Sequence, residues 1–338
     1  MIEYIDINHA QELDAFVKQH EYSHFMQTSL WGRVKKDWGW HGMICRDSKG
    51  KIKGTMAFLT HKISHTKTCL LYSPRGPIFD LGDEETFREL IDGAKALAKK
   101  LNAYRLRFDP RIEAENEDFI KLAMGEGFSR DAASDYSLFQ PRMCYVLDLE
   151  GKTKESLSAQ YHRTTRYNLN HSRNQGVEVR LGTIDELPEF CAMMAMTAEK
   201  NEFTPRSQNY FREFLEGLGE YARLYFATFE GKIIAGSIAV FYGNRSWLMY
   251  SCSDGAYRKK HPNELLQYVV QCDSMDLGCR YYDFRGVEGY PVEDNPKIGL
   301  HKYKQGFGAE FFNYVGQFDF TVKPFMCKLL DFTMGLKK

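Results

Sequence analysis

An internal repeat limits what this chain can fold into more than any other feature of its sequence. Residues 50–58, GKIKGTMAF, resemble residues 231–241, GKIIAGSIAVF. In both copies a Gly-Lys turn leads into an apolar run that has a small residue near its start. This pattern is typical of a β-hairpin.

The similarity continues beyond the hairpin. In each copy a second β-rich run follows, and then an amphipathic helix at 84–101 or 263–277. Each helix leads into a short strand with an aspartate, at 104–109 or 280–283. The sequence therefore predicts two α+β units in tandem. A strand-like run at 143–148 places the boundary between them near residues 140–150.

The bulk properties exclude several classes of protein. The 338 residues contain 45 basic and 45 acidic side chains, so the chain as a whole does not attract polyanions. The eight cysteines show no zinc-ligand or disulfide spacing. The N-terminus has no signal-peptide pattern, and no apolar run is long enough to span a membrane. We expect a soluble, cytoplasmic protein that acts as a monomer.

A local basic cluster stands out against this balance. If residues 156–175 form one helix ended by Gly176, then Arg163, Arg166 and Arg173 lie on one face of it. Arginine binds phosphate oxygens well, so this arginine stripe could hold an anion such as the backbone of an RNA. The alternative is a solvated face whose acidic partners come from elsewhere in the fold.

Five motifs in order give the chain a resemblance to a known family. The chain resembles the Fem family, the aminoacyl-tRNA-dependent transferases that build the side branch of peptidoglycan. The motifs are SLWGRVK at 29–35, YSPRGP at 72–77, RYN at 166–168 with RNQGVEV at 173–179, YDFRGV at 282–287, and YKQGFG at 303–308 with YVG at 314–316. No heptad run interrupts the second half, so the chain is similar to the compact members typified by FemX. Two positions depart from the pattern: Arg285 replaces a usual glycine, and Tyr303 a usual phenylalanine.

The resemblance implies an α+β fold of two GNAT-like (acyl-CoA N-acyltransferase) units, each a mixed twisted sheet flanked by helices. We expect the first unit at 1–145, with 318–338 returning to it, and the second at 146–317. The C-terminal segment 324–336 would place Phe325, Leu329, Phe332 and Leu336 on one helical face. This face would pack on the first unit or contact an anionic membrane weakly.

The implied activity is that of an aminoacyltransferase. It would move an amino acid from aminoacyl-tRNA to the side-chain amine at position 3 of a peptidoglycan precursor, either UDP-MurNAc-pentapeptide or lipid II. This would add the first residue of the interpeptide bridge. The ester is already activated, so we expect neither a cofactor nor a metal. The sequence does not identify the amino acid, the acceptor residue or the choice between a soluble and a lipid-linked acceptor.

Two residues are candidates for the chemistry. The resemblance assigns Lys304 to the transfer step, where its ammonium could stabilise charge on the reacting oxygens. Asp109 is a candidate general base, although a free aspartate has a pKa near 3.9 and is weak in this role. Alternatively, Lys304 is a surface lysine without a catalytic function, and Asp109 caps the turn before Pro110. The substrate itself could then assist proton removal.

Four further positions match the family's residues for the acceptor's diphosphate. They are Lys35, four residues after Trp31, and Arg206, Tyr210 and Tyr250. An arginine can clamp a diphosphate through two hydrogen bonds while a tyrosine hydroxyl donates another. The arginine stripe of Arg163, Arg166 and Arg173 would then hold the tRNA.

Two other functions remain open. An acyl-CoA-dependent N-acyltransferase would need a Q/R-x-x-G-x-G/A loop from a strand into a helix, and QGFGA at 305–309 is a poor match. A non-catalytic RNA-binding protein would explain the arginines but not Lys35, Arg206 and Lys304.

Overall fold

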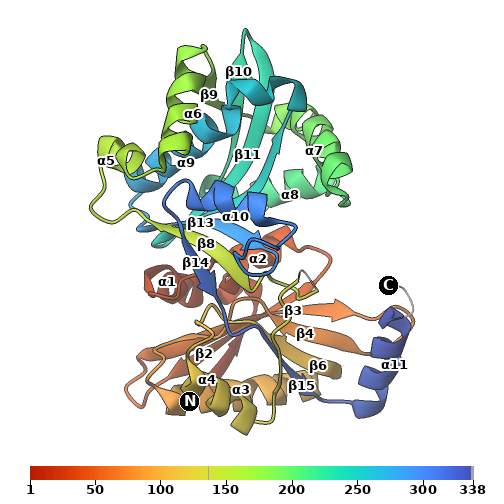
Figure 1. Ribbon diagram of the computed structural model, residues 1–338. Helices are drawn as coiled ribbons and strands as arrows, with labels where there is room; N and C mark the ends of the chain where they lie inside the picture. Colours follow the sequence, from red (N-terminus) through yellow and green to blue (C-terminus); the bar gives the residue numbers. More distant parts are fainter. Residues whose placement is uncertain (136, 336–338) are drawn as a thin grey trace. The chain divides into compact units, whose positions relative to one another are not determined.

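The structure is a computed structural model that describes residues 1–135 and 137–335. The chain divides into two compact units. Unit 1 comprises Met1–Arg142 and Asn313–Lys338, and unit 2 comprises Met143–Phe312. The last strand and helix of the chain therefore belong to the same unit as its N-terminal half (Figure 1).

Unit 1 contains a mixed sheet in the order β1-β2-β3-β4-β6-β15-β7, with β5 paired to β3. Strands β4 and β6 are parallel, and helix α3 lies between them in the chain. The strands are β1 Ile2–Ile5, β2 Gly39–Arg46, β3 Ile52–Lys62, β4 Cys69–Ser73, β5 Ile78–Phe79, β6 Ala103–Phe108, β7 Ser129–Asp131 and β15 Gln317–Thr321. The α-helices are α1 Gln11–Gln19, α2 Ser29–Val34, α3 Glu84–Lys100, α4 Glu117–Gly125 and α11 Pro324–Gly335, with 3₁₀ turns η1 Ile7–His9 and η2 Phe25–Gln27.

Helix α3 forms because its apolar residues recur at helical spacing and its first turn is capped. The carboxylate of Asp83 accepts a 3.1 Å hydrogen bond from the backbone of Thr86. Phe87, Leu90 and Leu97 are buried against alternate residues of β2, β3 and β4. This packing makes the core of unit 1.

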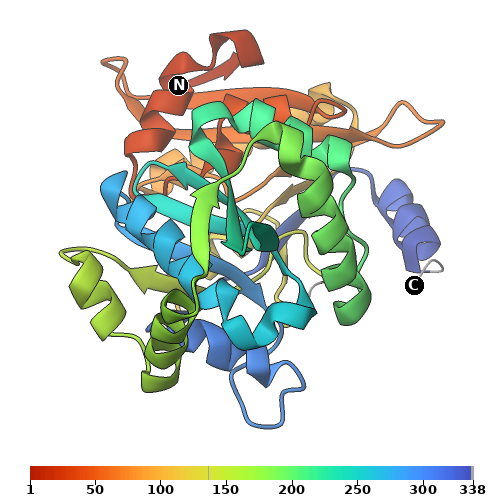
Figure 2. The same ribbon diagram turned by 90° about the horizontal axis from the view of Figure 1, so that it is seen from above.

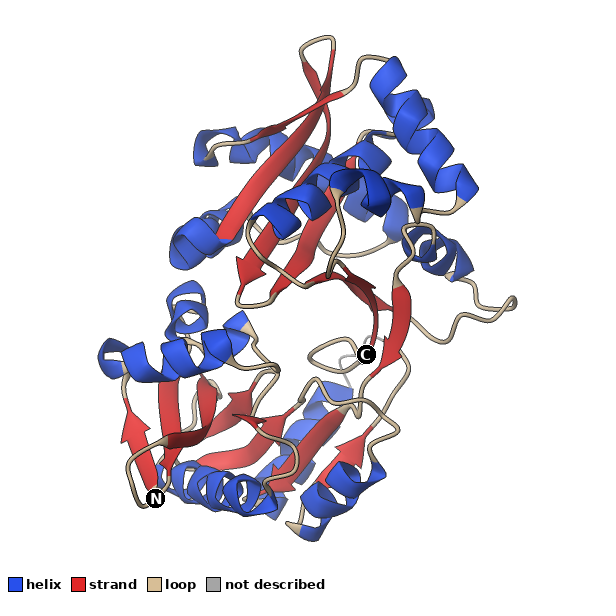
Figure 3. Cartoon of the chain, turned by 90° about the vertical axis from the view of Figure 1, so that its left-hand side faces the viewer, coloured by secondary structure: helices blue, strands red, loops and turns tan. Residues whose placement is uncertain are grey.

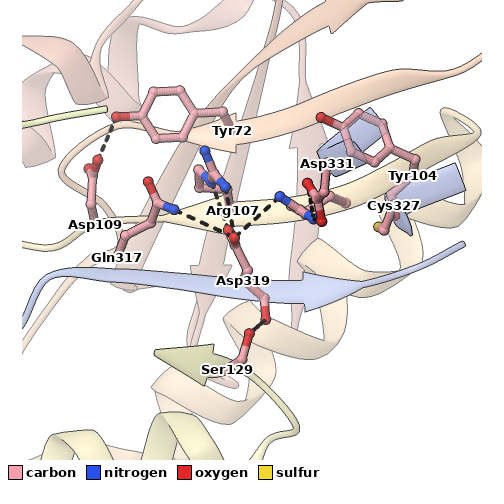
Figure 4. Close-up of polar contacts among 10 residues, drawn as sticks. Tyr72, Tyr104, Arg107, Asp109, Ser129, Gln317, Asp319, Cys327 and Asp331 are labelled. Carbon is pink, nitrogen blue, oxygen red and sulfur yellow. Dashed lines mark hydrogen bonds and ion pairs between the residues drawn. The ribbon is translucent and has the colours of Figure 1, made fainter. Parts of the chain in front are cut away.

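Ion pairs tie the C-terminal segment to β6 (Figure 4). Arg107 of β6 donates two 2.7 Å hydrogen bonds to Asp319 of β15. Arg105 binds Asp331 of α11 at 2.7 Å. Because both arginines are largely withdrawn from water, these charge-assisted contacts hold β15 and α11 on this sheet.

The expected packing face of the last helix is wrong. Met326, Cys327 and Leu330 of α11 pack on Leu70, Tyr72 and Tyr104. Phe325, Leu329 and Phe332 are instead 80%, 46% and 66% exposed. Of the four residues assigned to that face, Leu336 lies outside the described residues. The adjacent stripe is preferred because the smaller Cys327 fits close to the sheet, where its thiol lies 3.2 Å from the carbonyl of Tyr104.

Unit 2 contains a sheet in the order β14-β8-β13-β12-β11-β10-β9. Helices α6 and α9 cover one face, and α7 and α8 cover the other (Figures 1 and 3). The strands are β8 Met143–Asp148, β9 Glu178–Leu181, β10 Ala222–Phe229, β11 Lys232–Tyr242, β12 Arg245–Ser253, β13 Tyr281–Val287 and β14 Glu310–Asn313. The helices are α5 Lys154–Ala159, α6 Arg163–Asn174, α7 Leu187–Asn201, α8 Gln208–Leu218, α9 Pro262–Asp276 and α10 Ile298–Gln305, with 3₁₀ turns η3 Ile184–Glu186, η4 Gly219–Tyr221 and η5 Gly255–Lys260.

The repeat in the sequence corresponds to a repeat in topology. In unit 1 three antiparallel strands, β2, β3 and β4, lead through α3 to the parallel strand β6. In unit 2 strands β10, β11 and β12 lead through α9 to the parallel strand β13. Each fourth strand then pairs with an antiparallel strand from elsewhere in the chain, β15 or β8.

The single helix expected at 156–175 is wrong, because the chain breaks between α5 and α6. Tyr161 turns inward at the break and donates a 2.6 Å hydrogen bond to Gln271. The backbone of His162 donates to the carbonyl of Gly306 at 2.8 Å. A side chain at position 306 would collide with Thr165, so this contact requires glycine there. The arginine stripe itself survives, since all of it lies in α6.

Candidate functional site

A cavity in unit 2 lies where β12 and β13 part. The two strands are paired over Arg245–Trp247 and Tyr281–Asp283. Further along, their residues line a cavity of about 280 Å³ together with parts of α9 and α10. The lining residues are Leu248, Met249, Tyr250, Ser251, Asn263, Gln267, Phe284, Arg285, Leu300, Tyr303 and Lys304. Two of the predicted site residues, Tyr250 and Lys304, therefore share one cavity.

Lys304 is a buried cation in this cavity. It lies near the end of α10, is only 5% exposed, and donates hydrogen bonds to the carbonyls of Arg285 at 3.0 Å and Gly286 at 2.7 Å. Burial lowers the pKa of Lys304 to about 8, Asp283 opposes this shift, and Arg285 adds to it. An ammonium has three protons, so one remains for an oxygen in the cavity.

An irregularity in β13 makes these two carbonyls available. The pairing of β13 with β8 shifts register between Asp283 and Gly286. Arg285 has a φ of +63°, a left-handed conformation that costs a residue with a side chain about 1–2 kcal/mol. A glycine, which the motif leads us to expect at this position, would adopt this conformation without that cost. Here the Asp283 carboxylate supports the turn by accepting a 2.7 Å bond from the backbone of Arg285.

Tyr250 of the cavity wall contacts a second tyrosine, and an arginine lies beside that tyrosine. The hydroxyl of Tyr250 donates to that of Tyr210 at 3.0 Å, and the guanidinium of Arg206 lies 5.3 Å from the centre of the Tyr210 ring. Burial raises the pKa of both tyrosines, while Arg206 and Arg285 act to lower it. The hydroxyls are therefore neutral donors close to two cations.

Helix α8 positions Tyr210. Ser207 caps the helix by accepting from the backbone of Tyr210 at 3.2 Å. Phe211 and Phe214 on the same helix pack edge-on against the ring of Tyr250. The predicted residues Arg206, Tyr210, Tyr250 and Lys304 thus form one connected group in unit 2.

Lys35 belongs to unit 1. It ends helix α2, and its ammonium lies 5.1 Å from the centre of the Trp31 ring. Trp31 is buried and packs edge-on against Phe25. The spacing of four between Trp31 and Lys35 is therefore a helical contact.

Asp109 also belongs to unit 1 and is buried (Figure 4). One carboxylate oxygen accepts from the hydroxyl of Tyr72 at 2.6 Å, and the other accepts from the backbone of Arg75 at 2.7 Å. Burial raises the pKa of Asp109, and Arg75 opposes the shift. Both bonds go to the 72–77 segment, so Asp109 organises that turn. The sequence also allowed Asp109 to cap the turn before Pro110. Its carboxylate instead binds Tyr72 and the backbone of Arg75, which lie more than thirty residues earlier in the chain.

The arginine stripe lies on the exposed side of α6. Arg163, Arg166 and Arg173 are exposed, whereas Leu169 and Ser172 face the core. Arg166 donates to the carbonyl of Ala159 at 2.8 Å, and Arg173 stacks on Tyr268 at 4.4 Å. In the described part of the chain, none of the three arginines lies within 4.0 Å of a carboxylate.

Sequence reasoning missed two features of these surfaces. The run Arg258–His261 spans the end of η5 and lies beside α6. Lys260 donates to Gln175 at 2.7 Å, and His261 packs on His171. It enlarges the basic surface and was visible as RKKH in the sequence. Asn263 in the cavity has a buried carbonyl oxygen with no partner among the described residues. Nothing in the sequence indicated this.

Comparison with known proteins identifies the family. The FemAB family model matches residues 9–232 and 229–334. The chain belongs to the FemAB family. Among curated relatives, the Lipid II:glycine glycyltransferases of Staphylococcus haemolyticus and Staphylococcus aureus are each 24% identical to it. Both matches cover 95% of this chain and 93% of the relative.

Solved structures show the same fold. A crystal structure of FemX superposes with a TM-score of 0.89 at 22% identity, covering 97% of this chain and 99% of FemX. A tandem GNAT protein from the clavulanic acid biosynthesis pathway gives 0.56 at 12% identity, covering 95% and 98% of the two chains. The expected family and the expected fold of two GNAT-like units are confirmed.

The described residues lack two kinds of feature. None of the helices in the described part of this FemAB protein is long and apolar enough to cross a bilayer. Residues 1–135 and 137–335 also contain no group of three or more His, Cys, Asp or Glu side chains that could hold a metal ion.

Proposed function

We propose that this FemAB protein transfers an amino acid from aminoacyl-tRNA to the side-chain amine at position 3 of a peptidoglycan precursor. The observation that carries the proposal is the buried ammonium of Lys304 in the cavity that Tyr250 also lines. The names of the staphylococcal relatives, which are glycyltransferases acting on lipid II, support the same class of reaction. The product would carry the first residue of the interpeptide bridge.

The reaction needs no redox partner and no further activation. The acceptor amine attacks as the free base after it has given one proton to water. A C–N bond forms to the ester carbonyl, and the C–O bond to the tRNA ribose breaks. The second proton of the amine passes to the departing ribose oxygen, so the products are an amide and a free tRNA 3′ end.

Lys304 would stabilise the charge that develops during this exchange. The ester carbonyl oxygen becomes negative as the amine adds, and then the ribose oxygen does as it leaves. The carbonyls of Arg285 and Gly286 fix the ammonium, so it need not reorganise when the charge appears. Removing one such donor commonly costs a factor of about 10²–10³ in rate.

Arg206, Tyr210 and Tyr250 would bind the diphosphate of the acceptor. The guanidinium supplies a pair of parallel donors, and the neutral hydroxyl of Tyr210, which accepts from Tyr250, supplies a further donor beside it. For Lys35 of unit 1, phosphate binding stays a prediction from the resemblance, and its ammonium lies over the Trp31 ring. A free carboxylate beside these donors would repel the diphosphate. The carboxylate of Asp283 is already bound, because it accepts a hydrogen bond from the backbone of Arg285 and pairs with Arg245.

The arginine stripe on α6 and the basic run of η5 would hold the tRNA. A few contacts to phosphates suffice for affinity without any reading of sequence. Among the described residues no carboxylate lies within 4.0 Å of the three arginines of α6, which favours this function over a solvated, internally paired face.

The structure weakens the acyl-CoA alternative. In the sequence 305–309 the glycines follow helix α10 and lead into β14, which is the reverse of the strand-to-helix loop that cradles a pyrophosphate. The loop that does lead from β12 into α9 has His261 and Asn263 where the Q/R-x-x-G-x-G/A pattern needs small residues. Calorimetric titration with acetyl-CoA checks this directly, and we expect no saturable heat.

The test of the proposal is transfer itself. Radiolabelled aminoacyl-tRNA is incubated with the precursor and the protein, and label in the precursor is counted with and without prior ribonuclease treatment. We expect label only when the tRNA is intact. In a parallel incubation with radiolabelled acetyl-CoA and no tRNA, label in the precursor would support the alternative reaction.

A further inference from the structure

The exposed side of helix α11 has an unusual composition. Phe325, Leu329 and Phe332 are separated by four and three residues, so they project from the same side of the helix. The exposed Lys328 lies among them. The opposite side holds Met326, Cys327 and Leu330, which pack on the sheet. We call Phe325, Leu329 and Phe332 the apolar face.

A group of lysines borders the start of this helix. Lys323 donates to the carbonyl of Asn102 at 3.3 Å, and the Asn102 side chain donates to the carbonyl of Lys67 at 2.6 Å. Lys62 and Lys67 line one open cavity with Leu101, the residue that follows Lys99 and Lys100. We call Lys62, Lys67, Lys99, Lys100 and Lys323 the basic edge.

Several observations place the basic edge and the apolar face on one side of unit 1. Ile63, in the β3–β4 hairpin, packs on the same cluster as Cys327 of α11. Burial raises the pKa of the Cys69 thiol, and the charges of Lys323 and Lys62 act together against that shift. In Figures 1 and 2 the β3–β4 hairpin and α11 lie at the same end of the unit 1 sheet.

Acidic residues are nearly missing from this surface. The sequence has no Asp or Glu in 53–79 or in 93–108. Asp331 is the nearest carboxylate along α11, and Arg105 binds both of its oxygens at 2.7 and 3.0 Å. The lysines therefore form an excess of positive charge on a chain whose total charge is zero.

We propose that the apolar face and the basic edge together dock unit 1 on an anionic membrane surface. Large aromatic and aliphatic side chains enter the boundary between headgroups and acyl chains, while lysines bind the anionic headgroups. An RNA ligand would account for the lysines of the basic edge, but it would not account for the exposed side chains of Phe325, Leu329 and Phe332. The docking is peripheral and does not depend on the transfer reaction proposed above.

Vesicle co-sedimentation tests this with the full chain. One set of vesicles contains phosphatidylglycerol and phosphatidylcholine, and the other contains phosphatidylcholine alone. We expect binding to the anionic vesicles only, and weaker binding as salt is raised. The variant F325S/L329S/F332S and the variant K62Q/K67Q/K100Q should each bind at least about tenfold more weakly, since a lysine near an anionic surface contributes about fivefold.

Matched controls separate docking from general effects. K49Q/K51Q/K121Q removes the same charge from other exposed positions of unit 1, and M124S/L181S/M196S removes exposed apolar groups elsewhere. Both should bind as the wild type does. Melting curves check that every variant folds, and transfer to the soluble UDP-linked acceptor should be unchanged in all of them.

Specific outcomes would overturn the proposal. These are equal binding of wild type and both test variants, equal binding to the two vesicle types, or no sedimentation at low salt. A wild-type dimer in solution that F325S/L329S/F332S converts to a monomer would show that a second copy covers the apolar face instead. Loss of docking with normal transfer leaves the proposed function intact, and the reverse result leaves the docking intact.

Discussion

The Nζ atom of Lys304 lies 2.7 Å from the carbonyl oxygen of Gly286, inside the wall of the unit 2 cavity. This bond joins helix α10 to the irregular part of β13, and it fixes a cation where two strands have parted. A charge in this position is costly to bury, and a lysine with no function would be expected to reach solvent instead. The predictions below begin from this contact.

Removing the ammonium should abolish most of the transfer. Lys304→Met keeps the length and apolar stem of the side chain, so we expect the protein to fold and the single-turnover rate to fall by about 10²–10³-fold. KM for the precursor should change little, because the diphosphate is held by Arg206 and the tyrosines. Near-normal turnover by Lys304→Met would remove Lys304 from the mechanism.

The pH dependence of the single-turnover rate should reflect the titration of Lys304. The pKa of Lys304 is lowered to about 8, so its ammonium is lost as pH rises through that value. The acceptor amine acts oppositely, because more of it is free base at higher pH. The single-turnover rate should therefore level off or decline above about pH 8. In Lys304→Arg the cation persists, and the rate should keep rising across this range. Identical pH profiles would contradict the assignment.

The diphosphate contacts should affect binding of the precursor. Arg206→Ala should raise its KM by about 10–100-fold, since a charge-assisted hydrogen bond contributes about 1.5–3 kcal/mol. Tyr250→Phe should raise it by about fivefold, because the Tyr210 hydroxyl loses the hydrogen bond that orients it. KM for the aminoacyl-tRNA serves as the internal control and should stay constant. If only the KM for aminoacyl-tRNA changed, Arg206 and Tyr250 would belong to the tRNA site and not to the diphosphate site.

The arginine stripe should affect the other substrate. Replacing Arg166 and Arg173 by alanine should raise KM for aminoacyl-tRNA by about tenfold at moderate salt. It should also flatten the dependence of binding on salt by about one unit of slope for each lost phosphate contact. Lys49→Ala with Lys121→Ala, which removes equal charge from unit 1, should do neither. Steady-state transfer rates measure the KM, and filter binding over a salt series measures the slope.

Substitutions of Asp109 distinguish a structural function of this residue from a catalytic one. Asp109→Ala leaves Tyr72 and the backbone of Arg75 without their buried acceptor, and should destabilise the protein by about 2–4 kcal/mol. Denaturant melting measures this loss. A catalytic base would behave differently: Asp109→Asn would then abolish transfer while the melting curve stayed close to that of the wild type.

Much of the fold could be predicted from local pattern. The hairpins at 50–58 and 231–241 and the helices after them are all present. The break between α5 and α6 could not be predicted, because it depends on contacts of Tyr161 and His162 with residues more than a hundred positions away. The packing side of α11 was equally hidden, since two neighbouring stripes of that helix are both apolar.

The site was predictable only in part, for a related reason. Motifs led to Lys304, Arg206, Tyr210 and Tyr250, which the structure brings together. They gave no hint of the carbonyls that hold Lys304, because backbone acceptors leave no mark in a sequence. The unpaired oxygen of Asn263 likewise becomes visible only once the packing around it is known.

Mass spectrometry of the precursor tests the central claim most directly. UDP-MurNAc-pentapeptide and, separately, lipid II are incubated with the protein and a mixture of charged tRNAs, and fragment ions locate any added mass. We predict the mass of one amino acid on the side-chain amine of the third stem residue, absent after ribonuclease treatment and greatly reduced with Lys304→Met. Unchanged precursors in both incubations, or an acetyl group added only with acetyl-CoA, would contradict the account.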